Sequence, residues 1–126
     1  MKAKKMRVGI ISREDYKKRT IAIASGQYKP KRREPKVWFE SVQSMAQVLS
    51  DGNRELLRII AEQKPRSLKD LEEATGRKVS NLSRTLRTMS RYGIVDLTKK
   101  GKAVVPTVKA TDFRVDFGLY TFFPHI

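Results

Sequence analysis

The chain has 126 residues, of which 39% are hydrophobic, and its 28 Lys and Arg against 13 Asp and Glu give a formal net charge of +15. This length suits one domain with extensions and a single modest core, and the charge predicts attraction to a polyanion. The absence of Cys excludes disulfides, thiol catalysis and thiolate metal sites. No apolar run approaches the roughly 18 residues of a membrane span, and no secretory signal is evident. We therefore expect a cytoplasmic protein.

The positive charge is concentrated at the start of the chain. Residues 1–36 hold thirteen Lys and Arg and three acids, a net charge of +10, and are predicted to form a basic N-terminal extension. Alternating apolar residues at 6–11 indicate a short strand. A capping box at Ser12–Asp15 predicts a helix to about Ser25 that ends at Gly26, with Tyr16, Thr20 and Ile23 on its weakly apolar face.

A linker punctuated by prolines is predicted at residues 28–36. Two interpretations stay open, namely an arm that tracks phosphates or the minor groove of DNA and a solvated tether. Its basic side chains are Lys29, Lys31, Arg32, Arg33 and Lys36.

A domain is predicted over residues 37–117. It opens at Trp38, which we interpret as a packing residue. The spacing of Val42, Met45, Ala46 and Leu49 predicts a helix of about ten residues. Ser50–Asn53 breaks that helix and caps the next, whose core-facing residues are Leu56, Leu57, Ile60 and Ala61.

The centre of the chain has the pattern of a helix-turn-helix. Ser67 and Asp70 form a capping box, a short apolar stripe (Leu68, Leu71, Ala74) follows, and Gly76 stops this first helix. The second helix, residues 80–92, carries Leu82, Leu86 and Met89 at i, i+4, i+7 on one face. Its start is ambiguous, because the Lys78 side chain is no helix cap and Ser80 could cap instead.

A basic hairpin is predicted directly after this helix. Tyr92-Gly93 ends the helix, residues 94–97 indicate a strand, residues 99–102 a lysine-rich turn, and residues 103–106 the start of the return strand. Helix, helix and hairpin together predict a mainly α fold with a small antiparallel β wing, which is an α+β winged helix-turn-helix.

Residues from about Phe39 to Phe117 resemble the MarR/ArsR-type winged helix-turn-helix regulators. The motifs that carry the resemblance are Ser67-Leu68-xx-Leu71-xx-Ala74-x-Gly76, Ser80-x-Leu82-Ser83-Arg84-x-Leu86, Tyr92-Gly93-Ile94-Val95 and the wing. The chain more narrowly resembles a family of small predicted transcriptional regulators, some of them putative antitoxins. The features of that pattern are Phe39-Glu40-Ser41, Arg54-xx-Leu57-xx-Ile60, Gly76-Arg77 and Pro106 after the wing.

The polar face of the second helix has the residue types that contact bases in the major groove, where Arg binds guanine and Asn binds adenine. The predicted base-reading residues are Ser80, Asn81, Arg84, Arg87 and Thr88, and the predicted backbone contacts are Arg77, Lys78, Arg91, Lys99, Lys100 and Lys102. The competing interpretation is a solvated basic face.

The C-terminal end is apolar. Phe113, Val115 and Phe117 alternate with Arg114 and Asp116, which predicts a half-buried strand that extends the wing sheet or pairs with residues 6–11. Residues 118–126 either fold back on the core or form a subunit or partner interface. The candidate interface residues are Leu119, Tyr120, Phe122, Phe123 and Ile126.

We expect no enzymatic activity, no cofactor and no bound metal. The only His, His125, lies one residue from the last residue of the sequence, without a second His or Cys to share a metal or a nucleophile motif nearby. We therefore expect a sequence-specific regulator of double-stranded DNA, acting as a homodimeric repressor. The alternatives are an antitoxin that binds a cognate toxin and represses its own gene, and a non-specific DNA- or RNA-binding architectural protein.

Overall fold

The computed structural model describes residues 4–119, and these divide into two compact units. Lys4 and residues 47–111 form the helical unit, and residues 5–46 and 112–119 form the sheet unit. The helical unit is thus inserted between two segments of the sheet unit. This division differs from the predicted boundaries at 36/37 and 117/118, because strands at both ends of the chain pair with each other.

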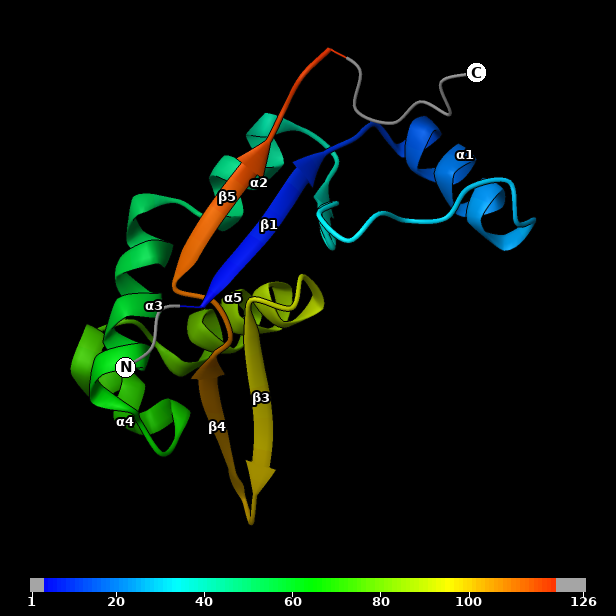
Figure 1. Ribbon diagram of the computed structural model, residues 1–126. Coiled ribbons are helices and arrows are strands. Elements are labelled where there is room, and N and C mark those ends of the chain that lie inside the picture. Colours follow the sequence, from blue (N-terminus) through cyan, green and yellow to red (C-terminus); the bar gives the residue numbers. More distant parts are fainter. Residues whose placement is uncertain (1–3, 120–126) are drawn as a thin grey trace. The chain divides into compact units, whose positions relative to one another are not determined.

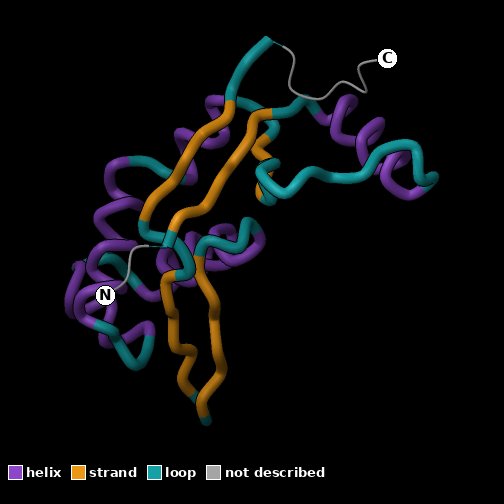
Figure 2. Tube along the Cα trace, viewed as in Figure 1, coloured by secondary structure: helices purple, strands orange, loops and turns teal. Residues whose placement is uncertain are grey.

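A three-stranded parallel sheet organises the sheet unit (Figures 1 and 2). Its strands are β1 (Lys5–Ile10), β2 (Val37–Phe39) and β5 (Asp112–Asp116), in the order β2-β1-β5. Val8 is in register with Val37 on one side and with Val115 on the other. Parallel neighbours require crossover connections: α1 (Arg13–Ala24) lies between β1 and β2 in the sequence, and the whole helical unit lies between β2 and β5. The predicted pairing of β5 with residues 6–11 is therefore confirmed. Strand β5 pairs with the central strand β1 and does not extend the hairpin.

Local sequence signals set the ends of α1. The Ser12 hydroxyl accepts a hydrogen bond from the backbone N–H of Asp15, and Gly26 follows the helix at φ 81°. The predicted apolar face was wrong, however. Arg19 and Ala22 are the buried residues, whereas Tyr16 is 46% exposed, because Trp38 and Tyr28 pack on the Ala22 side.

Strand β2 was not predicted, since three residues after a proline give little local signal. Its aromatic residues anchor it. Phe39 is fully buried, and Trp38 packs against Ile11 and Ala22 while the Arg19 guanidinium lies 5.1 Å from its ring centroid. Gly9 of β1 lies against the same indole, where a Cβ would approach Trp38 to 2.4 Å. The sheet therefore requires glycine at this position.

The division of the sequence between the two units falls within helix α2 (Val42–Val48), which is shorter than the predicted ten residues or so. In the helical unit, α3 (Asp51–Gln63) begins at Ser50, whose hydroxyl accepts from the N–H of Asn53 as predicted. It buries Leu56, Leu57 and Ile60 and ends at Lys64, a non-glycine residue at φ 49°.

The two helices predicted from the helix-turn-helix pattern are both present. Helix α4 (Leu68–Thr75) begins at Ser67, whose hydroxyl accepts from the N–H of Asp70, and ends at Gly76 with φ 77°. Leu71 is buried, but Ala74, assigned to the apolar stripe, is exposed. Helix α5 (Val79–Arg91) buries Leu82, Leu86 and Met89 completely.

An antiparallel hairpin of β3 (Val95–Lys100) and β4 (Ala103–Val108) completes the helical unit. Its turn is tighter than predicted, because Lys99 and Lys100 belong to β3 and only Gly101 and Lys102 form the turn. Pro106 lies within β4, paired with Leu97 and buried, not after the wing. The whole molecule is therefore mixed α/β, with five helices, the hairpin and a parallel sheet in its described part.

Among residues 4–119, no helix is long and apolar enough to cross a membrane.

Candidate nucleic-acid interface

Helix α5 separates apolar and cationic residues on two faces. Leu82, Leu86 and Met89 form the buried face. The opposite face exposes Ser80, Asn81, Arg84, Arg87 and Arg91, and the helix contains no Asp or Glu. The exposed face is therefore uniformly cationic, with polar side chains between the arginines.

The start of α5 is fixed by a residue of the preceding helix. Lys78 is the N-cap without a side-chain capping bond, so Ser80 is not the cap and the helix begins at Val79. The Glu72 carboxylate of α4 accepts a hydrogen bond of 3.1 Å from the N–H of Val79. An acidic group at a helix N-terminus also stabilises the helix dipole. Only residues 76–78 separate the two helices, and the hydrogen bond between Glu72 and Val79 connects them across this short turn.

Arg77 is used inside the helical unit. Its guanidinium donates to Asn81 Oδ1 at 2.8 Å and to Thr85 Oγ1 at 3.0 Å, both on α5, and to Asn53 Oδ1 of α3 at 3.2 Å. Asn53 in turn donates to the carbonyls of Gln47 and Val48 at the end of α2. Sequence reasoning placed Arg77 among the phosphate contacts and missed this network, which only the tertiary structure assembles.

Two other predicted base-reading side chains make bonds within α5. Arg87 Nε donates to the carbonyl of Ser83 at 3.4 Å, and the Thr88 hydroxyl donates to the carbonyl of Arg84 at 3.2 Å. The remaining guanidinium N–H groups of Arg87 and the acceptor capacity of Thr88 are not used by these bonds.

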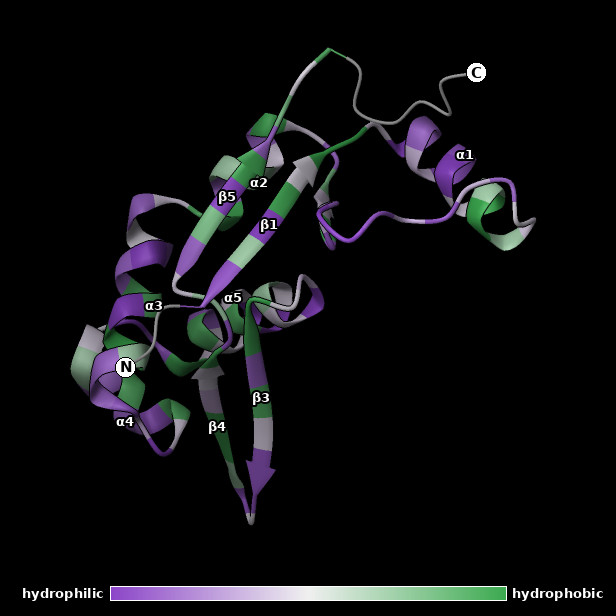
Figure 3. Ribbon diagram, viewed as in Figure 1, coloured by the Kyte–Doolittle hydropathy of each residue, from purple (hydrophilic) through white to green (hydrophobic). Residues whose placement is uncertain are grey.

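A hollow of about 370 Å³ brings α5 and the hairpin together. Arg87 and the buried Leu86 line it from α5, and Lys99 lines it from β3. Its other lining residues are Leu68, Ser83, Leu97 and Val104. Lys99, Lys100 and Lys102 are exposed at the end of the hairpin, which is strongly hydrophilic in Figure 3. Arg87 and Lys99, which were predicted from two separate sequence motifs, therefore line one hollow.

The predicted basic arm is partly anchored to the sheet unit. Lys29, Lys31, Arg32, Arg33 and Lys36 are all exposed, but Pro35 between them is buried and the N–H of Lys36 donates to the Arg7 carbonyl of β1. Glu34 accepts from the Lys31 N–H and from Arg19, 3.4 Å away. This segment is thus not a free tether along its whole length.

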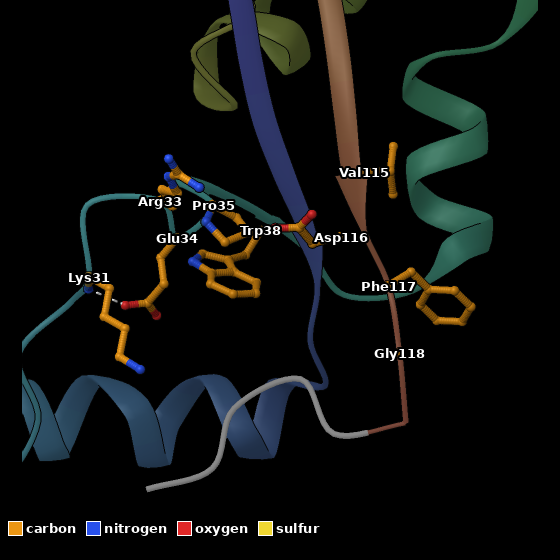
Figure 4. A pocket seen from close by; sticks show the side chains of 9 residues that line it. All are labelled: Lys31, Arg33, Glu34, Pro35, Trp38, Val115, Asp116, Phe117 and Gly118. Atoms are coloured by element: carbon orange, nitrogen blue, oxygen red, sulfur yellow. Dashed lines mark hydrogen bonds between the residues drawn. The ribbon is translucent and has the colours of Figure 1, made fainter.

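Glu34 also interacts with the hydroxyl group of Tyr28, a half-buried residue. Burial, with help from the Glu34 carboxylate, raises the pKa of Tyr28 to about 12. Burial acts against ionisation of Glu34, but the Tyr28 hydroxyl, the Lys31 N–H and Arg19 outweigh it and lower the pKa of the carboxyl group. Glu34, Trp38 and the end of β5 line a cavity of about 600 Å³ in this unit (Figure 4).

Of the predicted C-terminal interface, only Leu119 belongs to the described residues, and it is 91% exposed. Tyr120, Phe122, Phe123 and Ile126 lie outside them.

The helical unit has three helices followed by a hairpin, an α+β arrangement compatible with a winged-helix fold. The chain belongs to the HVO_A0114 family, whose model matches residues 48–115. No curated protein matches the sequence. A crystal structure of a predicted DNA-binding transcriptional regulator from E. coli is similar to this one with a TM-score of 0.45 and 15% sequence identity, covering 72% of this chain and 82% of that one.

Proposed function

We propose that this protein is a sequence-specific transcriptional regulator that binds double-stranded DNA as a winged helix-turn-helix protein. The observation that carries the proposal is the acid-free, exposed face of α5, whose Arg87 lines a hollow together with Lys99 of the hairpin. An α-helix fits into the major groove of DNA, and an adjacent hairpin reaches the neighbouring backbone or minor groove. The chain's net charge of +15 would favour approach to the duplex.

The exposed residues of α5 divide into two roles. Arg84 and Asn81 are the principal base-reading residues, supported by Ser80, Arg87 and Thr88. Lys78, Arg91 and the hairpin residues Lys99, Lys100 and Lys102 would contact phosphates, which position the protein without reading sequence. Arg77 is assigned a different role, which is to hold Asn81 on α5 through their 2.8 Å hydrogen bond.

We further propose that the regulator acts as a homodimeric repressor on paired half-sites, and that it binds DNA without catalysing a reaction on it. Two-fold symmetric proteins bind half-sites spaced by about one helical turn, roughly 34–36 Å.

Selection from a random duplex library tests the proposal. The purified full-length protein is incubated with the library at two salt concentrations, and the enriched sequences are determined. We expect one motif with paired half-sites to persist at the higher concentration. Binding that collapses with salt and enriches no motif would show instead an electrostatic, non-specific protein.

The exposed Leu119 favours an antitoxin role as a second candidate function, because the apolar C-terminal sequence begins there. This role predicts a partner protein that co-purifies with the full chain and is lost when residues 119–126 are deleted. A homodimer that binds DNA and retains no partner in its native cells would exclude it.

A further inference from the structure

Strand β5 is an edge strand with an apolar, exposed face. Among residues 4–119 it pairs only with β1, at one end of the order β2-β1-β5. Val115 is 45% exposed, and Phe117, directly after the strand, is 66% exposed. Phe113, Val115 and Phe117 share one face of the strand, and Asp112, Arg114 and Asp116 share the other. Edge strands of this composition present backbone groups and side chains that another strand can pair with.

The hydrogen bonds of β1 show which backbone groups of β5 point outward. The carbonyl of Arg7 accepts from Lys36, and the N–H of Ile11 donates to Phe39, so odd-numbered residues of β1 bond toward β2. Even-numbered residues therefore bond toward β5. Since Val8 is in register with Val115, it bonds the residues on either side, Arg114 and Asp116. The N–H and C=O groups of Phe113 and Val115 consequently point to the open edge.

We propose that two copies of this chain dimerise by antiparallel pairing of their β5 strands, with the two-fold axis at Val115. The two sheets then become one six-stranded sheet with the order β2-β1-β5-β5-β1-β2. Val115 faces Val115 of the second copy, and Phe113 faces Phe117. These are hydrogen-bonded pairs, because the backbone groups of the odd-numbered residues point to the edge.

Charge complementarity selects this register. Centring on Val115 places Arg114 opposite Asp116 of the second copy, twice, at the non-hydrogen-bonded positions where side chains come closest. Centring on Arg114 or on Asp116 instead opposes two like charges at the axis. Centring on Phe113 pairs Arg114 with Asp112 but sets Thr111, which lies outside the strand, opposite Val115. The Val115 register alone combines both ion pairs with full use of the three apolar residues.

This inference rests on the proposed function, because it gives the interface of the homodimer proposed there. The dimer itself forms without DNA. A mass measurement on the free protein therefore separates the two, since a dimer that enriches no DNA motif would refute the proposed function and leave this inference intact.

Sedimentation equilibrium of the full-length chain without DNA tests the inference. We expect the wild type to reach twice the 14.5 kDa of one chain. Asp116→Arg places two arginines opposite each other at both positions and should weaken dimerisation by at least roughly tenfold. The double variant Arg114→Asp/Asp116→Arg restores opposite charges and should restore the dimer.

Two controls isolate the interface. Arg7→Gln removes the 3.5 Å ion pair between Arg7 and Asp116 within one chain and should leave the dimer unchanged. Asp112→Arg should also leave it unchanged, since residue 112 faces Gly118 in this register. Circular dichroism verifies that each variant is folded. A monomeric wild type, an undiminished dimer of Asp116→Arg, or a folded double variant that stays monomeric would each overturn the inference.

Discussion

Arg77 and Arg84 have the same side chain and lie seven residues apart, but their surroundings give them different roles. The guanidinium of Arg77 makes three hydrogen bonds to groups of α3 and α5. Arg84 lies on the exposed face of α5. Sequence pattern alone treats both as DNA contacts, whereas the tertiary contacts hold Arg77 inside the helical unit and leave Arg84 exposed, as its proposed recognition role requires.

Substitution of Arg84 by alanine should affect DNA recognition and not folding. A bidentate contact to guanine is worth about 1–3 kcal/mol of discrimination, so Arg84→Ala should lose that amount for the preferred duplex and flatten the base preference in a binding titration. Lys100→Ala is the matched control, which should weaken all sequences alike and reduce the salt slope by about 1. Unchanged affinity and preference in Arg84→Ala would show that α5 is not the reading helix.

Substitution of Arg77 by alanine should lower the stability of the fold, which Arg84→Ala should leave unchanged. Loss of its hydrogen bonds leaves Asn53 and Thr85 without this partner, and we expect the free energy of unfolding to fall by about 1–2 kcal/mol. Urea unfolding monitored by circular dichroism measures it, with Arg84→Ala as the control whose stability stays within about 0.5 kcal/mol of the wild type. Equal stabilities of the two variants would show that the Arg77 hydrogen bonds do not stabilise the fold.

At the level of elements, the segment between α1 and β2 depends on Glu34. This carboxylate joins Arg19 of α1 to the Lys31 N–H and the Tyr28 hydroxyl. The segment reads as a loose linker because its prolines and lysines dominate the sequence, but one partly buried acid orders it. The hairpin and α5 differ from this segment, because the local sequence predicts each of them. Only the hollow that they share depends on tertiary packing.

The Glu34 contacts predict a specific pH dependence. Because the folded-state pKa of Glu34 lies below its usual value of 4.5, its stabilisation is present above that value and is lost as the pH falls through the folded-state pKa. Glu34→Gln should therefore lower the Tm at pH 7, and the deficit should shrink on acidification. The exposed Glu73→Gln serves as the control in the same thermal scans. A deficit that is independent of pH would exclude the ionised carboxylate as its cause.

At the level of the whole molecule, the helical unit is nearly contiguous in sequence and the sheet unit is not. The described residues of the helical unit are Lys4 and 47–111, whereas the sheet unit needs β1 and β5 from opposite ends of the chain. The core of the helical unit is formed within 47–111 by residues of all three helices and the hairpin, including Leu56, Leu71 and Leu86.

A fragment of residues 47–111 should therefore fold alone. We expect a helical circular dichroism spectrum and a cooperative thermal transition, at a lower Tm than the full chain because so short a domain buries a smaller fraction of its surface. Residues 5–46 provide the control, since without β5 they lack one neighbour of β1 and should show no cooperative transition. A fragment 47–111 without a cooperative transition would show that the sheet unit is needed for its stability.

Prediction from the sequence succeeded where the cause of a structure is local. The caps at Ser12, Ser50 and Ser67 and the stripe of Leu82, Leu86 and Met89 depend on residues within two helical turns. The parallel sheet could not be predicted as a whole, because the pairing of β1 with both β2 and β5 depends on residues far apart in the chain. The Arg77 network was missed for the same reason, since Asn53 lies 24 residues away. The base and phosphate contacts remain predictions.

The distance between β1 and β5 also has a consequence for biosynthesis. Lys4 and Thr111, hydrogen-bonded at the start of this pairing, are 107 residues apart, so at 5–20 residues per second the ribosome needs roughly 5–20 s to supply the partner of β1. During that interval the apolar residues Val8 and Ile10 emerge on strand β1 with one of its edges unpaired. On a polysome, β1 is therefore the segment where nascent chains are expected to associate wrongly or to bind a chaperone.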